Sequence, residues 1–172
     1  MIALLIGLLV IALDQITKII IVAAKPVGTG HGFIEFNLTY NTGAAFSFMD
    51  DNTLFLAILS LIATIILIYI AFKHFKFNQK KLIHISIGLL IGGAAGNMID
   101  RFLTVFGVQK GVVDFIVVRF GSWEFPGTFN VADFFLVTGV CLIVLEILVL
   151  DTIKKHKQNK HERLSGNDNE NN

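Results

Sequence analysis

The stretch TLFLAILSLIATIILIYIAF, residues Thr53–Phe72, decides the class of fold because it contains no Asp, Glu, Lys or Arg. A helix needs about 20 apolar residues to cross the hydrocarbon core of a bilayer, and this stretch meets that requirement. The whole chain agrees with it: 54% of the 172 residues are hydrophobic, only 16% are charged, and the mean hydropathy is +0.71. Because a soluble domain carries about 25% charged residues, the composition excludes an ordinary water-soluble globule.

Three further apolar runs are long enough to span a membrane. They are Ile2 to about Val22, Leu82–Ile99, and about Val131–Leu150. The first run resembles a secretory signal in its position, but it lacks a basic region before it and is interrupted by Asp14 and Lys18. We therefore expect an uncleaved spanning helix there and four spans in all.

The lysines and arginines predict the orientation of these spans, because basic residues collect on the cytoplasmic side. The connection Lys73–Lys81 and the tail after Leu150 carry most of them. Both termini are then expected in the cytoplasm, with segments 23–52 and 100–130 outside the cell. The tail, residues 151–172, is basic and then polar, and it is expected to be disordered because it cannot bury a core. We expect one domain over residues 1–150.

The two outer segments are rich in residue types that favour strands. Phe33–Tyr40 and Val112–Phe120 have this composition, and Gly121-Ser122 suits a hairpin turn into Trp123-Glu124-Phe125. The aromatic residues of the hairpin are typical of the membrane interface. The sequence thus predicts an all-α membrane fold of four transmembrane helices with a small β-rich extracytoplasmic platform.

Ionisable and amide side chains gather at the outer end of the predicted spans, where charge in hydrocarbon is costly. Asp114 is the most telling, because it interrupts the apolar strand Val112–Val118. If Asp114 met Asp133, the two carboxylates could not both ionise, and the pair would hold one proton. Such a pair contains a general base and a general acid, which is the chemistry of aspartic proteases. Spacing in the sequence does not show whether the two aspartates meet.

The polar residues other than Asp114 also have structural explanations. Asn130 and Asp133 have the spacing of a helix N-cap and its first-turn acid. Asp14 and Lys18 have the spacing of an ion pair within one helix.

Two features of the third run likewise have a structural explanation. Asp100 and Arg101 suit an ion pair at the membrane surface, and they share one helix face with Asn97 by spacing. The four-residue spacing of Gly88, Gly92 and Gly96 favours close helix packing.

Several classes of function are excluded or disfavoured by the sequence. The formal net charge of +1 offers no basic field for nucleic acid. No His-Glu-x-x-His pair or cysteine cluster predicts a metal site, and no Gly-x-Ser-x-Gly setting predicts a serine nucleophile. A small proton- or ion-coupled transporter is an alternative, but its acids would have to line a path across the membrane. A non-catalytic assembly protein is a third possibility that leaves Asp114 unexplained.

Five motifs in order resemble bacterial lipoprotein signal peptidase, also called signal peptidase II, over residues 1–150. The motifs are Asp14-Gln15-Ile16-Thr17-Lys18, Asn41-Thr42-Gly43-Ala44-Ala45-Phe46-Ser47, Gly92-Gly93-Ala94-Ala95-Gly96-Asn97-Met98-Ile99-Asp100-Arg101, Val112-Val113-Asp114-Phe115 and Phe129-Asn130-Val131-Ala132-Asp133. Any one of them is weak evidence. Their order on four spans makes the resemblance specific.

The resemblance implies a membrane aspartic protease of the bacterial cell membrane that needs no metal or other cofactor. It implies cleavage of the signal peptide from diacylglyceryl-modified prolipoproteins, just before the lipid-modified cysteine, at the outer face of the membrane. By motif match, Asp114 and Asp133 would be catalytic. The remaining matched residues would support the dyad or bind the substrate: Asp14, Asn41, Gly43, Asn97, Arg101 and Asn130. The resemblance also implies contact with membrane lipid, an extracytoplasmic β-cradle, and inhibition by the cyclic peptide globomycin.

Overall fold

The computed structural model describes residues 2–28, 32–43, 52–74, 81–150 and 153. It contains the helices α1 (Ile2–Ala24), α2 (Thr53–His74), α3 (Lys81–Val105) and α4 (Val131–Val144), and α4 continues as a π-helical segment, Leu145–Leu150. Among the described residues, four helices are long and apolar enough to cross a membrane. The chain is therefore a multi-span membrane protein, as its composition predicts.

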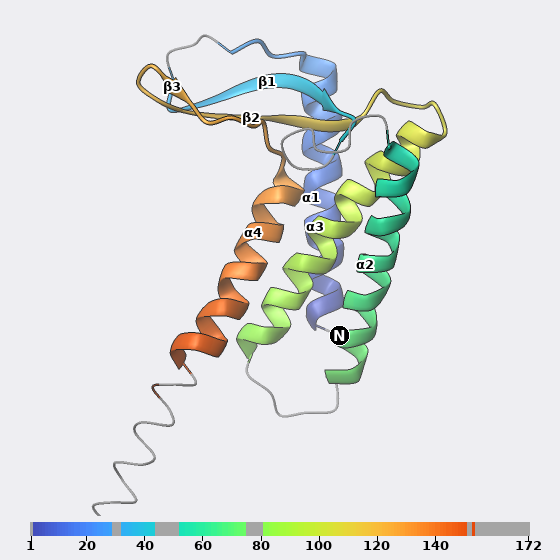
Figure 1. Cartoon of the computed structure of the whole chain (residues 1–172), viewed down its shortest axis with the longest axis vertical. Coiled ribbons are helices and arrows are strands. Elements are labelled where there is room, and N and C mark those ends of the chain that lie inside the picture. The colour runs from blue at the N-terminus through green and yellow to red at the C-terminus, as the bar shows by residue number, and fades with distance from the viewer. Residues whose placement is uncertain (1, 29–31, 44–51, 75–80, 151–152, 154–172) are drawn as a thin grey trace, which may run out of the picture.

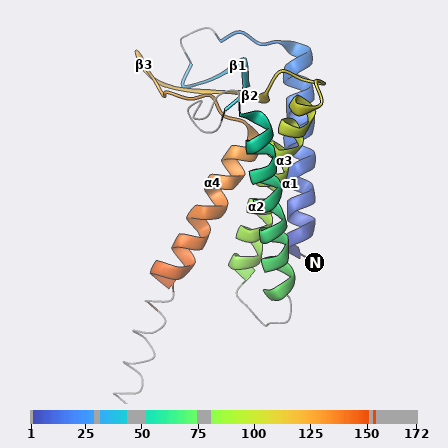
Figure 2. The same cartoon turned by 45° about the vertical axis from the view of Figure 1, so that its right-hand side comes forward.

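Helix α3 is the centre of the bundle and packs against α1, α2 and α4. Figures 1 and 2 show the helix axes lying roughly parallel, with α4 splayed away at the end remote from the sheet. Many large apolar side chains on the helix surfaces stay exposed, among them Leu8, Ile65 and Val137. Exposure on this scale suits a lipid-facing surface, because lipid tails are as apolar as these side chains.

The glycine face of α3 packs against α1, which confirms the structural explanation of its spacing. A Cβ atom added at Gly88 would lie 2.6 Å from the carbonyl oxygen of Ala3, and one added at Gly92 would collide with Val10. The absence of side chains at these positions lets the two helix backbones approach closely.

A three-stranded antiparallel sheet lies across one end of the bundle (Figure 1). Its strands are β1 (Ile34–Asn41), β2 (Val112–Phe120) and β3 (Trp123–Glu124), in the order β1-β2-β3. Gly121 has φ +64° in the turn between β2 and β3, a conformation that glycine adopts without strain. The predicted strands and hairpin are confirmed, and an irregular register between Phe36 and Thr39 shifts the pairing of β1 with β2.

The helix bounds differ from the expected ones mainly at α3. The third run ends by composition at Ile99, but the helix continues to Val105, so Asp100 and Arg101 are helical rather than part of an outer loop. Polar side chains are tolerated in this last stretch because groups on neighbouring elements form hydrogen bonds or ion pairs with them. The expectations for the lysine-rich residues 75–80, for the tail residues 154–172 and for Ala44–Ser47 fall outside the described residues.

Candidate functional site

Two aspartates that are 19 residues apart in sequence line one cavity beneath the sheet. Asp114 projects from β2 and Asp133 from the first turn of α4. The cavity has a volume of about 350 Å³. Its lining residues are Asn41, Asn97, Arg101, Val112, Asp114, Gly127, Thr128, Phe129, Asp133, Leu136 and Val137. The structure thus brings together the two carboxylates that the sequence singled out, between polar groups and apolar walls.

Asn130 connects the two aspartates, and its capping role is confirmed. Its side-chain oxygen accepts from the backbone N–H of Asp133 at 2.9 Å, while the Asp133 carboxylate accepts from the backbone N–H of Asn130 at 3.2 Å. This reciprocal capping box fixes Asp133 at the start of α4. The Nδ2 amide of Asn130 remains available and donates to Asp114 Oδ1 at 2.6 Å. One side chain therefore both caps the helix and holds the other aspartate.

Asn97 and Asn41 complete the hydrogen bonds around the carboxylates. Asn97 Nδ2 donates to Asp133 Oδ1 at 2.8 Å, and Asn41 Nδ2 donates to Asp114 Oδ2 at 3.0 Å. The orientation of the Asn41 amide is set by Gly43, whose backbone N–H donates to Asn41 Oδ1 at 3.0 Å. Every amide residue matched in the sequence thus reaches an aspartate directly.

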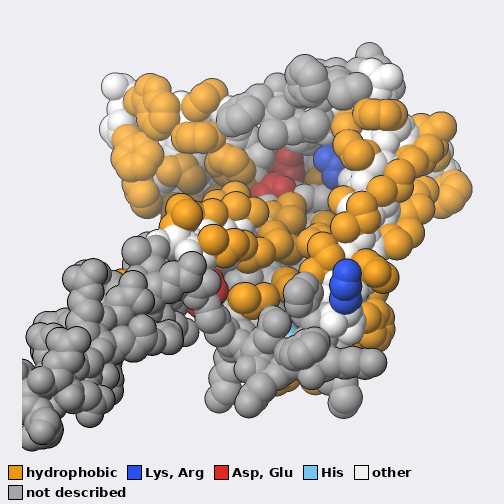
Figure 3. Space-filling view, turned by 60° about the horizontal axis from the view of Figure 1, so that its bottom comes forward, with side chains coloured by type: hydrophobic (Ala, Val, Ile, Leu, Met, Phe, Trp, Pro, Cys, Tyr) orange, Lys and Arg blue, Asp and Glu red, His pale blue; other side chains and the backbone are white. Residues whose placement is uncertain are grey.

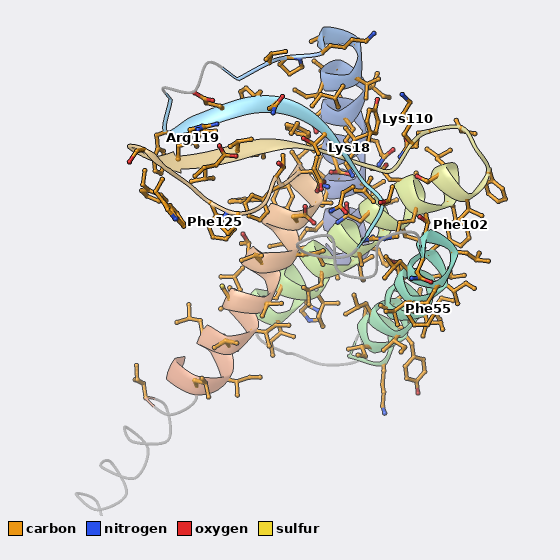
Figure 4. The ribbon with its side chains drawn as sticks, turned by 45° about the horizontal axis from the view of Figure 1, so that its top comes forward. Lys18, Phe55, Phe102, Lys110, Arg119 and Phe125 are labelled. Atoms are coloured by element: carbon orange, nitrogen blue, oxygen red, sulfur yellow. The ribbon has the colours of Figure 1, made fainter. Side chains whose placement is uncertain are left out.

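A buried ionic group lies behind the asparagines, on the α1 side of α3. Lys18 is 3% exposed, and its Nζ lies 2.8 Å from Asp14 and 2.9 Å from Asp100. Figure 4 shows Lys18 inside the bundle end, beneath the sheet. The pairing of Lys18 with Asp14 within the helix is confirmed. Gly96 admits this group, because a Cβ there would lie 2.6 Å from Asp14 Oδ2.

This ionic group is joined to the rest of the site by hydrogen bonds. Asp14 Oδ1 accepts from the backbone N–H of Ala132 at 2.9 Å, and Asp100 Oδ2 accepts from that of Val113 at 3.0 Å. Ala132 and Val113 are each adjacent in sequence to one of the two aspartates. Lys18 Nζ also donates to Asn97 Oδ1 at 3.2 Å. Asp14 and Asp100 therefore hold the backbone at both aspartates, and Lys18 holds an amide that touches Asp133.

Arg101 and Asp100 separate onto two sides of α3, which corrects the expectation of a shared face. Arg101 lines the cavity, and its Nη1 donates to Ser60 of α2 at 3.4 Å. Asp100 instead points toward α1, where the ion pair seen for it is with Lys18 rather than with Arg101. The reason is that successive helix positions are about 100° apart, so two neighbouring side chains can serve two different interfaces.

The electrostatics of the cavity shift the pKa of Asp114. Burial raises the pKa of Asp114 to about 7, and the nearby charge of Asp133 contributes in the same direction. Hydrogen bonds from Asn41 and Asn130 and the positive charge of Lys18 oppose the rise. A carboxyl group in this position holds a proton for much of the time at neutral pH, so it is able to act as an acid.

Lys18, Gln15 and Asp100 belong to the site, although the sequence did not place them among the site residues. Gln15 Nε2 donates to Asp14 at 3.2 Å and to Asp100 at 3.1 Å, which joins the two acids. The signal that could have found them is the motif at Asp14–Lys18 together with the acid at Asp100. Their contacts depend on how α1 packs against α3, and spacing within one helix does not give that.

Comparisons with known proteins agree with this geometry. A sequence profile described as signal peptidase (SPase) II matches residues 6–149. A lipoprotein signal peptidase from Listeria monocytogenes serotype 4a is 40% identical over 151 residues, which cover 86% of this chain and 93% of the relative. The lipoprotein signal peptidase of Listeria innocua serovar 6a matches to the same extent.

Two solved structures, both described as bacterial membrane enzymes, have the same fold. The first has a TM-score of 0.71 and 34% identity, and the match covers 85% of this chain and 87% of the other. The second has a TM-score of 0.67 and 32% identity, with coverage of 86% and 92%. Nothing in these matches supports the transporter alternative. The chain belongs to the signal peptidase II family, the membrane-bound aspartic proteases that remove signal peptides from prolipoproteins.

Proposed function

We propose that Asp114 and Asp133 are the catalytic dyad of this protease. The observation that carries the proposal is that the two carboxylates line one cavity while each is held by its own asparagine, Asp114 by Asn130 and Asp133 by Asn97. Two acids kept together with apolar walls favour a state with one proton between them. That state supplies a general base and a general acid at the same time.

In this proposal Asp114 holds the proton before reaction and Asp133 is the base. Asp114 is 3% exposed, and burial is the main cause of its raised pKa. Asp133 is in the first turn of α4, where its carboxylate accepts from the backbone N–H of Asn130 at 3.2 Å. Asp114 is therefore the carboxyl group whose surroundings suit the acid, and the proposal leaves Asp133 as the base.

The reaction follows from these two protonation states. Asp133 takes a proton from a water molecule as the water oxygen bonds to the scissile carbonyl carbon, and Asp114 gives its proton to the carbonyl oxygen. The tetrahedral intermediate then collapses as the C–N bond breaks, Asp133 gives its proton to the leaving amine, and Asp114 recovers the one it donated. Both carboxylates return to their starting protonation states, and one water molecule is consumed for each peptide bond that is cleaved.

The remaining matched residues position the dyad or the substrate. Asn97, Asn130, and Asn41 with Gly43 behind it, orient the carboxylates, and Asp14 holds the start of α4 through Ala132. Arg101 is the proposed substrate-positioning group. It lines the cavity, and its buried Nε has no hydrogen-bond partner among the described residues, so it can donate to a peptide carbonyl.

The shape of the bundle supports an approach of the substrate from the membrane. Figure 3 shows acidic and basic side chains at the bottom of a hollow that hydrophobic side chains border. Leu136 and Val137 of α4 form part of the cavity wall. A helical signal peptide that slid along this apolar border would bring its carboxyl end to the dyad. We propose that the substrate carries a diacylglyceryl-modified cysteine just after the cleaved bond, and that its lipid stays in the bilayer.

We further propose that the sheet and the dyad face the outside of the bacterial cell membrane. The lysines of segments 73–81 and 151–172 support this orientation by the positive-inside rule, with both termini in the cytoplasm. Residues 1–150 then form the protease domain, and residues 151–172 form a cytoplasmic tail. Globomycin, a cyclic peptide, is proposed to bind in the same cavity and compete with the substrate.

The test is cleavage by the purified full chain in lipid vesicles, with one prolipoprotein supplied in two forms. We expect a shortened product from the diacylglyceryl-modified form, little from the unmodified form, and inhibition by globomycin. Equal cleavage of both forms would contradict the role of the lipid while leaving the protease assignment intact. No cleavage of either form by folded protein would contradict the proposed function itself.

A further inference from the structure

The end of the sheet that contains the β2–β3 hairpin and the start of β1 has two chemically different faces. Residues paired across antiparallel strands project to the same face, and residues alternate between faces along each strand. The pairs Ile34–Val118, Phe36–Ile116 and Phe120–Trp123 therefore share the face of β2 that carries Asp114. The pairs Glu35–Val117 and Arg119–Glu124 are on the opposite face.

The apolar face is the exposed one, which is the reverse of a sheet in water. Phe36 is 50% exposed, Phe120 is 57% exposed and Trp123 is 53% exposed, whereas Glu35 on the opposite face is only 6% exposed. Glu35 accepts from the backbone N–H of Gly32 at 2.7 Å, so its burial is satisfied. Exposed large rings beside a buried acid indicate a surface that does not face water.

The exposed rings of Phe33, Phe120 and Trp123 continue through two half-buried rings, Phe125 and Phe129, in a row that begins at the start of a membrane-spanning helix. Ring centroids are 5.2 Å apart for Phe129 and Phe125, 5.9 Å for Phe125 and Trp123, 5.8 Å for Trp123 and Phe120, and 5.1 Å for Phe120 and Phe33. Phe129 directly precedes Asn130, the N-cap of α4. We call Phe33 and the hairpin residues 118–125 the aromatic arm.

The direction in which the arm faces follows from Asp114. Asp114 meets Asn130 at the start of α4, so the face of β2 that carries it is turned toward the helix bundle. In Figures 1 and 2 the strands run across the helix axes, and the β2–β3 end reaches sideways beyond α4. Of the described helices, α4 is the one that slants beneath the arm, and the exposed rings are turned toward the lipid-facing side of the bundle (Figures 1 and 2).

The opposite face of the arm is charged. Arg119 Nε lies 3.4 Å from Glu35, and Arg119 is also paired with Glu124. Figure 4 shows Arg119 and Phe125 at this end of the sheet, away from the part of the bundle that holds Lys18. The arm thus has the arrangement of an interfacial element, with rings on the side of the hydrocarbon and charges on the side of the water.

We infer that the aromatic arm inserts its rings into the membrane interface on the sheet side and anchors β2 to the bilayer. The occupant of the exposed apolar face is the lipid at the boundary between headgroups and acyl chains. The face is continuous, through Phe129, with the lipid-exposed surface of α4, where Phe134 is 62% exposed. Tryptophan and other aromatic side chains favour this depth in a bilayer. Because β2 carries Asp114, the anchor also fixes the height of that carboxyl relative to the membrane.

The chain provides its own reporter for this inference, because Trp123 is its only tryptophan. The full protein is reconstituted in phosphatidylcholine vesicles, and Trp123 fluorescence is measured with lipids brominated near the glycerol, with lipids brominated at the chain ends, and with aqueous iodide. We expect bromine near the glycerol to remove about half of the emission, with weaker quenching by chain-end bromine and by iodide, as an interfacial tryptophan requires. Efficient quenching by iodide without quenching by lipid would overturn the inference. Protection from both quenchers would also overturn it, because the arm would then pack against protein.

A matched pair of variants tests the assignment of the two faces. Phe120→Gln places an amide on the proposed lipid face beside Trp123, while Glu124→Gln places the same side chain on the opposite face of the hairpin. We expect Phe120→Gln to raise iodide quenching and lower lipid quenching, and Glu124→Gln to leave both unchanged. Equal effects of the two variants, or none from Phe120→Gln, would contradict the assignment. The wild-type measurement decides the depth even if a variant disturbs the hairpin.

Discussion

The two halves of the contact between α1 and α3 are built by opposite means. Away from the sheet, Gly88 and Gly92 bring the helices together without polar groups, against Ala3 and Val10. Near the sheet, the same two helices bury Lys18 between Asp14 and Asp100, all three almost completely inaccessible to solvent. Buried ion pairs contribute little net stability, because desolvation offsets their attraction. The glycine half shows that this helix pair can pack without charges, so the charges near the sheet are better explained by the site they position.

The largest expected effect concerns the acids that this polar half positions. Asp114→Asn and Asp133→Asn should each lower kcat by on the order of 10²–10⁴-fold, the usual range for a lost general acid or base. The double variant should be little slower than either single one, because members of one catalytic unit are not additive. Steady-state cleavage of a modified prolipoprotein measures this, with Glu124→Gln as a control outside the cavity. A folded single variant with normal turnover would remove that aspartate from the dyad.

Variants at Lys18 show whether the buried charges near the sheet serve stability or catalysis. Lys18→Met leaves two carboxylates without their cation, and breaking a buried pair in this way costs about 3–5 kcal/mol of stability. The charge-balanced double variant Lys18→Met/Asp100→Asn should regain part of that stability. Its kcat should stay on the order of 10–100-fold below that of the wild type, which is the usual loss when a residue that supports a site group is changed. The reason is that Asn97 has lost a donor that fixes its amide.

Thermal unfolding and kcat, measured on the same samples of the Lys18 variants, decide between the two explanations. Recovery of both quantities together in the double variant would mean that the ionic group serves stability alone. Recovery of the melting temperature without recovery of kcat is the result expected from the hydrogen bonds to Asn97.

The glycine half should respond in the opposite manner. Gly92→Leu forces the helices apart at Val10 and should cost about 1–3 kcal/mol, the usual cost of overpacking. Ala12→Leu adds a leucine on the exposed side of α1 and should leave the melting temperature unchanged. Because residue 92 does not line the dyad cavity, the kcat of folded Gly92→Leu should stay near that of the wild type. A loss of kcat without a loss of stability would show that the two halves are coupled.

The smallest effect is expected at the C-terminus. Deletion of residues 165–172 should leave cleavage unchanged, because the proposed orientation separates the tail from the dyad by about 30 Å of hydrocarbon. Cleavage is compared at equal amounts of protein in the membrane, determined by immunoblotting. A loss of turnover at equal abundance would show that the tail acts on the site and would contradict the division of the chain at residue 150.

The sequence predicts the elements of this molecule better than their contacts. The spans, both long strands and the capping residue Asn130 follow from local patterns, because hydropathy, strand propensity and cap chemistry are local properties. The partners of Asp100 and the use of Asn97 by Lys18 do not, because they arise only when α1 packs on α3. Asn130 also shows that the two explanations of a motif can both hold, since the residue caps α4 with one atom and holds Asp114 with another.

The central claim is that the two aspartates share one proton at neutral pH, with Asp114 as its carrier, and the pH dependence of kcat/KM tests it most directly. Since burial raises the pKa of Asp114 to about 7, its protonated form is lost as the pH rises through 7. The account therefore predicts that kcat/KM for a modified prolipoprotein falls about tenfold per pH unit above that value, because the general acid is then deprotonated. A kcat/KM that stays constant or rises between roughly pH 6 and 9, in protein shown to remain folded, would contradict the assignment of Asp114 as the acid.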